Sequence, residues 1–126
     1  MKRAYERLLD YVVVYTTSDE KSQTVPSAER EFDLAHKLVA EMKEIGIADA
    51  HVDDVYGTLP ATQGMEDKPV IGFIAHMDTA PDFCGQGVKP VLHENYDGGD
   101  VVLGKSGRTL SVKDFPHLKN YVGRTL

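Results

Sequence analysis

The sequence contains little cysteine, fewer basic than acidic residues, and no long apolar run. Its single cysteine, Cys84, has no second cysteine with which to form an internal disulfide. The 126 residues include 14 lysines and arginines against 20 aspartates and glutamates, which gives a formal net charge of −6. A chain with this balance repels phosphate backbones and anionic lipids. We therefore expect neither nucleic acid nor a membrane among its partners.

Targeting and membrane-spanning segments are also missing from the pattern. No apolar run approaches the roughly 18 to 20 residues that a membrane helix needs. Residues 1–3 lead into an amphipathic stretch rather than into the apolar core of a signal peptide. These observations predict a soluble, cytoplasmic protein. The length is sufficient for one domain with a modest core, or for part of one.

Two stretches near the amino terminus have the periodicity of amphipathic helices. In the first, apolar residues recur at helical spacing, namely Tyr5, Leu8, Leu9 and Val12. We expect this helix to run to about Tyr15, although the β-branched residues 12–14 would also suit a strand. After a surface loop over residues 16–26, Ser27 is a candidate N-cap for the second helix, and Gly46 is its predicted end. The apolar stripe of this helix comprises Phe32, Ala35, Leu38, Val39, Met42 and Ile45.

The remaining segments predict short strands. Residues 55–62 alternate between apolar and polar, and Pro60 in this stretch indicates an edge or a bulge. Residues 70–75 form a continuous apolar run that is too short for a helix and is typical of a strand buried on both faces. Residues 91–94 and 101–103 predict two more strands around a hairpin-like connection. The order of helices and strands predicts an α/β fold with a mixed sheet and flanking helices.

Two further patterns lie near the carboxyl end. Residues 99–106 match the letters of a phosphate-binding loop, but their middle is the predicted strand 101–103 and no clear helix follows. We interpret this match as a coincidence, because the phosphate-binding mechanism needs a helix amino terminus. Residues 112–122 keep roughly helical spacing, interrupted by Pro116, and Gly123 is a candidate helix end.

The apolar run 70–75 ends in the triplet His76-Met77-Asp78, and this is the strongest functional signal in the chain. Chemistry in α/β proteins collects beyond the carboxyl ends of such strands. Side chains two apart in an extended chain point the same way, so the imidazole and the carboxylate would share one face. The pair suits a metal site, while a hydrogen-bonded structural histidine remains the alternative.

A second triplet of the same spacing, His51-Val52-Asp53, lies in a polar stretch. Short motifs recur by chance, and a solvated strand edge explains this one. His36 lies beside the apolar stripe of the second helix, where a histidine is ordinarily structural or solvated, so we assign it no role.

Residues 72–83 (GFIAHMDTAPDF), together with Glu94-Asn95-Tyr96 and Gly98-Gly99-Asp100, closely resemble the peptidase T family, a group of zinc tripeptide aminopeptidases among the M20 metallopeptidases. The likeness covers the whole chain and includes three further short motifs: Val25-Pro26-Ser27, Gly57-Thr58-Leu59 and Phe115-Pro116. It implies that residues 1–126 are the amino-terminal part of a zinc-peptidase-like (phosphorylase/hydrolase-like) catalytic domain. The remainder of that domain, and the lid or dimerisation domain, would lie outside this sequence.

The resemblance also implies a function and a site. The complete protein would remove the amino-terminal residue from tripeptides, using two zinc ions, with a small peptide as its substrate and a homodimer left open. His76 would be a zinc ligand, and Asp78 would support the catalytic site without touching the metal. The bridging aspartate and the general-base glutamate of the family would lie after Leu126. A chain with one of the three protein ligands that a catalytic zinc needs should be inactive alone.

Several assignments stay open at this stage. Other M20 activities, such as a dipeptidase, carboxypeptidase or deacylase, fit the same motif, and so does a non-catalytic fragment or binding module. Asp82 is either a solvated loop carboxylate or part of the substrate pocket. Cys84 suits a small, partly buried residue better than a nucleophile. A self-sufficient metal site would require another histidine to converge with His76, and the candidates are His36, His51, His93 and His117.

Overall fold

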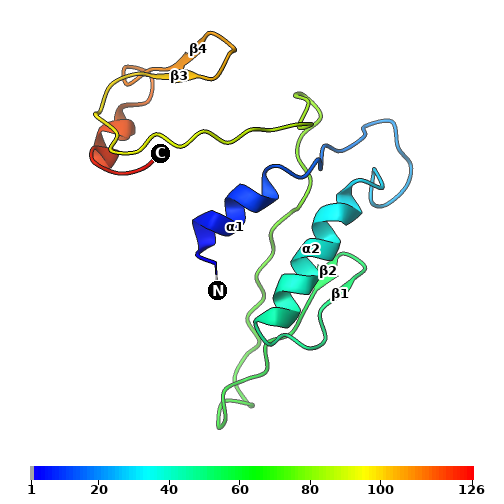
Figure 1. Cartoon of the computed structure of the whole chain (residues 1–126). Helices are drawn as coiled ribbons and strands as arrows, with labels where there is room; N and C mark the ends of the chain where they lie inside the picture. The colour runs from blue at the N-terminus through cyan, green and yellow to red at the C-terminus, as the bar shows by residue number, and fades with distance from the viewer. Residues whose placement is uncertain (1) are drawn as a thin grey trace. The chain divides into compact units, whose positions relative to one another are not determined.

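The structure is a computed structural model that describes residues 2–126. It divides into two compact units, residues up to Val88 and Lys89–Leu126, which are described separately. Both helices and strands are present, as the α/β prediction required (Figure 1). The predicted mixed sheet is absent from the described residues, whose sheets are two separate antiparallel hairpins.

Helix α1 (Ala4–Tyr11) is the first element of the first unit. It ends four residues before the predicted Tyr15, because the β-branched run 12–14 leaves the helix in a turn in which Val14 N–H donates to the Tyr11 carbonyl at 2.9 Å. None of its described side chains is buried, and Tyr5 and Leu8 are exposed. Its amphipathic pattern is therefore present without a packed apolar face.

Helix α2 (Glu31–Glu44) supplies most of the buried residues of this unit. Its predicted end is confirmed, since Gly46 adopts a φ of +99°. The N–H of Ile47 reaches the Met42 carbonyl and the N–H of Gly46 reaches the Lys43 carbonyl, which is a Schellman motif. The predicted N-cap is wrong: residues 28–30 form turns before the helix, and the Ser27 hydroxyl instead donates to the Glu31 carboxylate at 2.6 Å.

A small hairpin follows α2. Strand β1 (His51–Val52) pairs antiparallel with β2 (Val55–Tyr56). The strand predicted over residues 55–62 is thus only two residues long, because Pro60 cannot donate to a ladder and no partner strand continues beyond Tyr56 among the described residues. Gly57 packs closely on α2, where a Cβ atom would lie 2.4 Å from the Met42 methyl group.

The predicted buried strand over residues 70–75 is not formed. This segment has neither helix nor strand, and it runs as a plain ribbon after β2 in Figure 1. Val70 is 98% exposed and Phe73 is 95% exposed. An apolar run makes burial favourable, but a strand also needs a neighbour that accepts and donates its backbone hydrogen bonds, and the described residues provide none here.

The second unit is built on a hairpin. Strand β3 (Val101–Leu103) pairs antiparallel with β4 (Arg108–Leu110), and the 3-10 helix η1 (Pro116–Tyr121) follows. Tyr96, Val101 and Leu118 form its small buried cluster. The turn between the strands contains residues 104–107, with a Ser106 N–H to Leu103 carbonyl hydrogen bond of 3.2 Å. The phosphate-loop match over residues 99–106 therefore falls on β3 and the turn after it, with β4 rather than a helix following, which agrees with its interpretation as a coincidence.

One strand prediction in this unit is wrong. Residues 91–94 contain no strand, and β3 pairs with β4 instead. His93 exchanges two backbone hydrogen bonds with Leu126, of 3.0 and 3.1 Å. The strand predicted over residues 91–94 is therefore not formed, although His93 has a backbone hydrogen-bonding partner in Leu126. The helical spacing over residues 112–122 corresponds only to η1. This helix starts at Pro116, because proline lacks the N–H that would hydrogen-bond to a preceding turn.

The described residues include no helix that combines the length and apolar character needed to cross a membrane.

The left-handed conformation at Gly46 gives a test of the α2 terminus. Gly46→Ala should lower the free energy of unfolding by about 1 kcal/mol, because a Cβ is unfavourable at positive φ. Gly72→Ala is the matched control, since Gly72 has no positive φ and no atom within 4 Å of a built Cβ. Urea unfolding followed by circular dichroism measures both, and equal stability of the two variants would contradict the assignment.

Candidate functional site

His76 and Asp78 lie together, as the triplet predicted. The His76 Nδ1 is 3.1 Å from Asp78 Oδ1 and 2.9 Å from the Asp78 backbone oxygen. The His76 side chain is 85% exposed and that of Asp78 is 43% exposed. The pair therefore stands at the surface, on an irregular segment rather than at the end of a strand.

The contacts of Nδ1 define the protonation of the imidazole. A carbonyl oxygen and an ionised carboxylate only accept hydrogen bonds, so Nδ1 must carry the proton that both of them face. In the neutral ring the lone pair then lies on Nε2, for which the described residues provide no hydrogen-bond partner. The Nε2 lone pair of His76 is therefore the one that the contacts of the ring leave available for a metal ion.

A distant segment holds Asp78 from its other side. The Ser18 hydroxyl donates to Asp78 Oδ2 at 2.8 Å and lies 2.9 Å from the Thr79 carbonyl. Residues 16–18 also form an isolated parallel bridge with Thr79: the Ser18 N–H donates to the Thr79 carbonyl and the Thr79 N–H donates to the Thr16 carbonyl, each at 3.0 Å. The loop that carries the site is thus fixed to the segment after α1.

Thr17 is the buried centre of this junction. Its hydroxyl lies 3.2 Å from the Thr79 hydroxyl and accepts a hydrogen bond of 3.0 Å from the Gly85 N–H. Its carbonyl accepts a 2.7 Å hydrogen bond from Arg30 Nε, and the Arg30 guanidinium lies over the Tyr15 ring. Thr17 is only 6% exposed, so its polar atoms are buried with their partners.

The same contacts determine the charge state of Asp78. The hydrogen bond from the Ser18 hydroxyl is the main influence that lowers the pKa of the Asp78 carboxyl, and His76 acts in the same direction. Partial desolvation opposes both of these effects. Asp78 therefore stays ionised at neutral pH, as a carboxylate that accepts from His76 must be.

An open concavity of about 630 Å³ lies beside the pair. Residues 73–78 form one wall, and the others come from the loop before α2 and from the β1–β2 hairpin, with Val25, Pro26, Val55 and Tyr56 among them. The lining combines apolar side chains with polar and charged ones, which include Ser18, Thr24, Ser27, Glu31, Asp54, His76 and Asp78.

The other residues considered from the sequence do not join the site. His51 is exposed in β1, with its Nδ1 2.8 Å from the Asp49 carbonyl, which agrees with a solvated strand edge. His36 is exposed on α2, stacked on Phe32. Asp82 is exposed. Cys84 is also exposed, which corrects the expectation of partial burial, because the glycine-rich turn around it packs through its backbone.

Three metal ligands are not assembled here. The described residues contain no group of three or more His, Cys, Asp or Glu side chains that could hold a metal ion. His76 suits one ligand position, since its Nε2 is directed away from its hydrogen-bond partners and its side chain is exposed. A catalytic zinc generally needs three protein ligands, and His76 is one candidate for such a position.

Sequence reasoning missed Ser18 and Thr17. Both lie in a stretch of Thr, Ser and Asp that carries no periodic signal, about 60 residues before the motif that they support. Hydroxyl residues in a loop ordinarily bond to nearby backbone. No local pattern distinguishes those that reach a distant segment.

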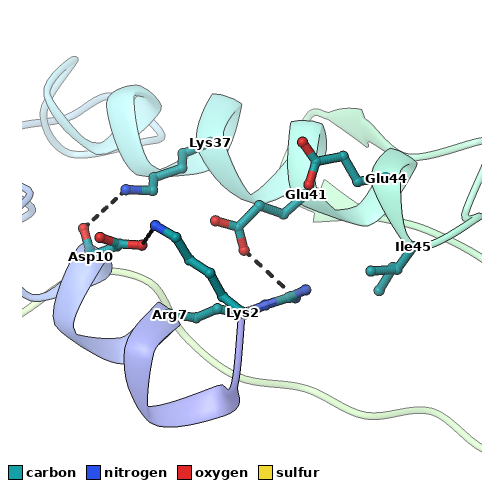
Figure 2. Close-up of a pocket in the computed structure, with 7 residues that line it drawn as sticks. All are labelled: Lys2, Arg7, Asp10, Lys37, Glu41, Glu44 and Ile45. Carbon is teal, nitrogen blue, oxygen red and sulfur yellow. Dashed lines mark hydrogen bonds and ion pairs between the residues drawn. The ribbon is translucent and has the colours of Figure 1, made fainter.

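A second hollow, of about 530 Å³, lies between α1 and α2 and is highly charged (Figure 2). Its charges pair with one another: Lys2 with Asp10, and Arg7 with Glu41 at 3.6 Å. Lys37 Nζ donates to the Asp10 carbonyl at 3.1 Å. The Arg7–Glu41 ion pair and the Lys37 hydrogen bond link the two helices, and the cations and carboxylates of the lining balance, so no excess of one charge sign is present to attract a ligand.

Several known proteins similar to this chain share the name Peptidase T. This chain is 50% identical to the Peptidase T of Caldanaerobacter subterraneus, over all of this chain and 32% of the relative. It is also 50% identical to the Peptidase T of Alkaliphilus oremlandii, over all of this chain and 32% of the relative, and to that of Geobacillus kaustophilus, over 96% of this chain and 30% of the relative. The chain belongs to the peptidase T family.

Identity at this level runs through the whole chain, so residues 76–78 lie in a segment that the peptidase T relatives align from end to end. The chain spans about a third of the length of these curated relatives. No protein-family model matches the chain.

The junction around Thr17 can be tested through Gly85. A Cβ at this position would lie 2.7 Å from the Thr17 hydroxyl oxygen and 3.4 Å from that of Thr79. Gly85→Ala should weaken the bridge by about 1.4 kcal/mol, so the Ser18 and Thr79 amides should exchange about tenfold faster. Hydrogen exchange measured by NMR gives both rates. Unchanged rates, or the same change in Gly72→Ala, would contradict the packing described here.

Proposed function

We propose that this chain is the amino-terminal part of the catalytic domain of a metal-dependent peptidase that removes the amino-terminal residue from tripeptides. The observation that carries the proposal is the 50% identity, along the whole chain, to proteins named Peptidase T. The arrangement of His76 and Asp78 supports it, because a neutral imidazole that donates through Nδ1 to a carboxylate is the usual form of a metal-ligating histidine.

In this proposal the chain contributes part of a zinc-peptidase-like domain. His76 Nε2 holds one of two zinc ions, Asp78 keeps the imidazole in its Nδ1–H form, and the concavity beside them receives the small peptide. Zinc, when bound, polarises the scissile carbonyl and lowers the pKa of a water molecule. The bridging carboxylate and the general-base glutamate come from outside this chain.

Several observations favour an incomplete site over a self-sufficient one. In this proposal the first unit supplies one ligand, and neither His36 nor His51 is grouped with His76 into a metal cluster among the described residues. The apolar residues 70–75 are exposed, as expected of a segment whose partner strands belong to the rest of a larger sheet. The chain by itself would then be a scaffold with one ligand rather than an enzyme.

Zinc binding by the chain tests whether His76, rather than His51 of the second triplet, is the metal ligand. In a titration followed through the imidazole NMR signals, zinc should shift the His76 ring at Nε2, with weak affinity because one imidazole acts alone. His76→Ala should abolish this response, and Asp78→Ala should weaken it about 10- to 100-fold by releasing the ring. His51→Ala, at a triplet of the same spacing, should leave it unchanged. An equal loss in the His51 and His76 variants would contradict the assigned ligand.

A segment exchange tests the activity. The 126-residue chain would replace the matching segment of the Caldanaerobacter Peptidase T, and release of amino-terminal residues from tripeptides would be measured with zinc and with a chelator. We expect metal-dependent release that His76→Ala lowers by more than about 100-fold, since a ligand matters at least as much as its supporting partner. The exchanged protein with His51→Ala should be as active as the exchanged protein without a substitution.

Three results would contradict this proposal. Metal-dependent turnover by the 126-residue chain alone would show that the site is complete within it. Faster cleavage of dipeptides, carboxyl-terminal residues or N-acyl amino acids by the exchanged protein would assign it to another hydrolase activity of the same mechanistic group. A folded exchanged protein, verified by circular dichroism, that cleaves none of these substrates would favour a binding module.

A further inference from the structure

The structure connects the candidate metal ligand to a residue 58 positions earlier in the chain. Asp78 has two carboxylate oxygens with different partners: Oδ1 faces His76 Nδ1 at 3.1 Å, and Oδ2 accepts from the Ser18 hydroxyl at 2.8 Å. The carboxylate therefore lies between a hydroxyl donor and an imidazole donor. Rotation of the carboxylate away from either donor would break both contacts.

The Ser18 hydroxyl has one proton and two nearby acceptors, Asp78 Oδ2 and the Thr79 carbonyl at 2.9 Å. The Thr79 carbonyl already accepts the Ser18 N–H at 3.0 Å. A hydrogen bond to an ionised carboxylate is about twice as strong as one to a neutral carbonyl. The proton is therefore directed mainly to Asp78.

The backbone around Ser18 is held independently of its hydroxyl. The bridge to Thr79 consists of backbone hydrogen bonds, and Thr16 and Thr17 are buried, at 4% and 6% exposure. Arg30 binds the Thr17 carbonyl at 2.7 Å and the Gly85 N–H binds its hydroxyl. Removing the Ser18 hydroxyl should therefore leave the segment in place while freeing the Asp78 carboxylate.

We propose that Ser18 is a positioning residue of the metal site: its hydroxyl orients the Asp78 carboxylate, and through Asp78 it keeps the His76 imidazole in the Nδ1–H form with Nε2 directed to the metal. The inference builds on the function proposed above and adds a contact that the His-x-Asp triplet does not contain. In this inference Ser18 acts through Asp78, whose Oδ2 accepts the Ser18 hydroxyl hydrogen bond at 2.8 Å.

The test reads the imidazole before any metal is added. In ¹⁵N-labelled 126-residue chain, the nitrogen shifts of His76 report which ring nitrogen carries the proton. The unaltered chain should show the Nδ1–H form, Ser18→Ala a mixture of both forms, and Ser18→Thr, which keeps a hydroxyl, a return toward the Nδ1–H form. Ser22→Ala is the matched control, because the Ser22 hydroxyl lies in the same loop before α2 and contacts the hydroxyl and the N–H of Thr24 rather than Asp78.

Zinc affinity gives the second readout. Ser18→Ala should weaken binding at His76 by about tenfold, the lower end of the 10- to 100-fold range for partners of metal ligands, with Ser18→Thr restoring most of it. Amide exchange of Thr79 should stay slow in Ser18→Ala, which would show that the backbone bridge survives.

Three outcomes would overturn the inference: an unchanged tautomer in Ser18→Ala, an equal effect of Ser22→Ala, or loss of the Thr79 amide protection, which would make Ser18 a structural link only. The proposed function fails separately. If His76→Ala leaves zinc binding unchanged while the tautomer still responds to Ser18→Ala, His76 is not the ligand. If His76→Ala abolishes zinc binding while Ser18→Ala leaves the His76 tautomer unchanged, only the positioning role of Ser18 is wrong.

Discussion

The parallel backbone bridge between Thr17 and Thr79 is the contact on which the rest of the candidate site depends. It joins segments 62 residues apart with two backbone hydrogen bonds of 3.0 Å, and the hydroxyls of the same two threonines lie 3.2 Å from each other. Long-range closure of this kind costs chain entropy. The buried position of Thr17 and its bonds to Arg30 and Gly85 offset that cost. The loop carrying His76 thereby acquires a fixed neighbour without belonging to a regular sheet.

Local signals in the sequence were sufficient for the helices and for the pairing of His76 with Asp78. Helix α2 follows its apolar stripe and ends at Gly46, because the stripe and the left-handed glycine are properties of consecutive residues. The His-x-Asp triplet works in the same way, since two side chains separated by one residue meet in an extended chain whether or not that chain is a strand.

Local sequence patterns did not predict which distant segments would pair with each other. Residues 70–75 and 91–94 have the letters of strands, yet one is exposed and irregular, and the other uses backbone bonds to the chain end. Strand formation depends on which distant segment offers its own backbone groups, and composition does not encode that. The same limit hid Ser18, whose significance comes entirely from a carboxylate 60 residues away.

The exposure of residues 70–75 also affects how this chain behaves among its own copies. Six consecutive residues without charge or proline, with a β-branched or aromatic majority, are a template for strand addition and for stacking into cross-β assemblies. The sequence places Asp67, Lys68 and Pro69 directly before them and Asp78 shortly after. Such flanking residues act as gatekeepers, because charge repulsion and a missing N–H interrupt the growing edge. Colloidal stability of the chain therefore depends on the ends of this segment rather than on its middle.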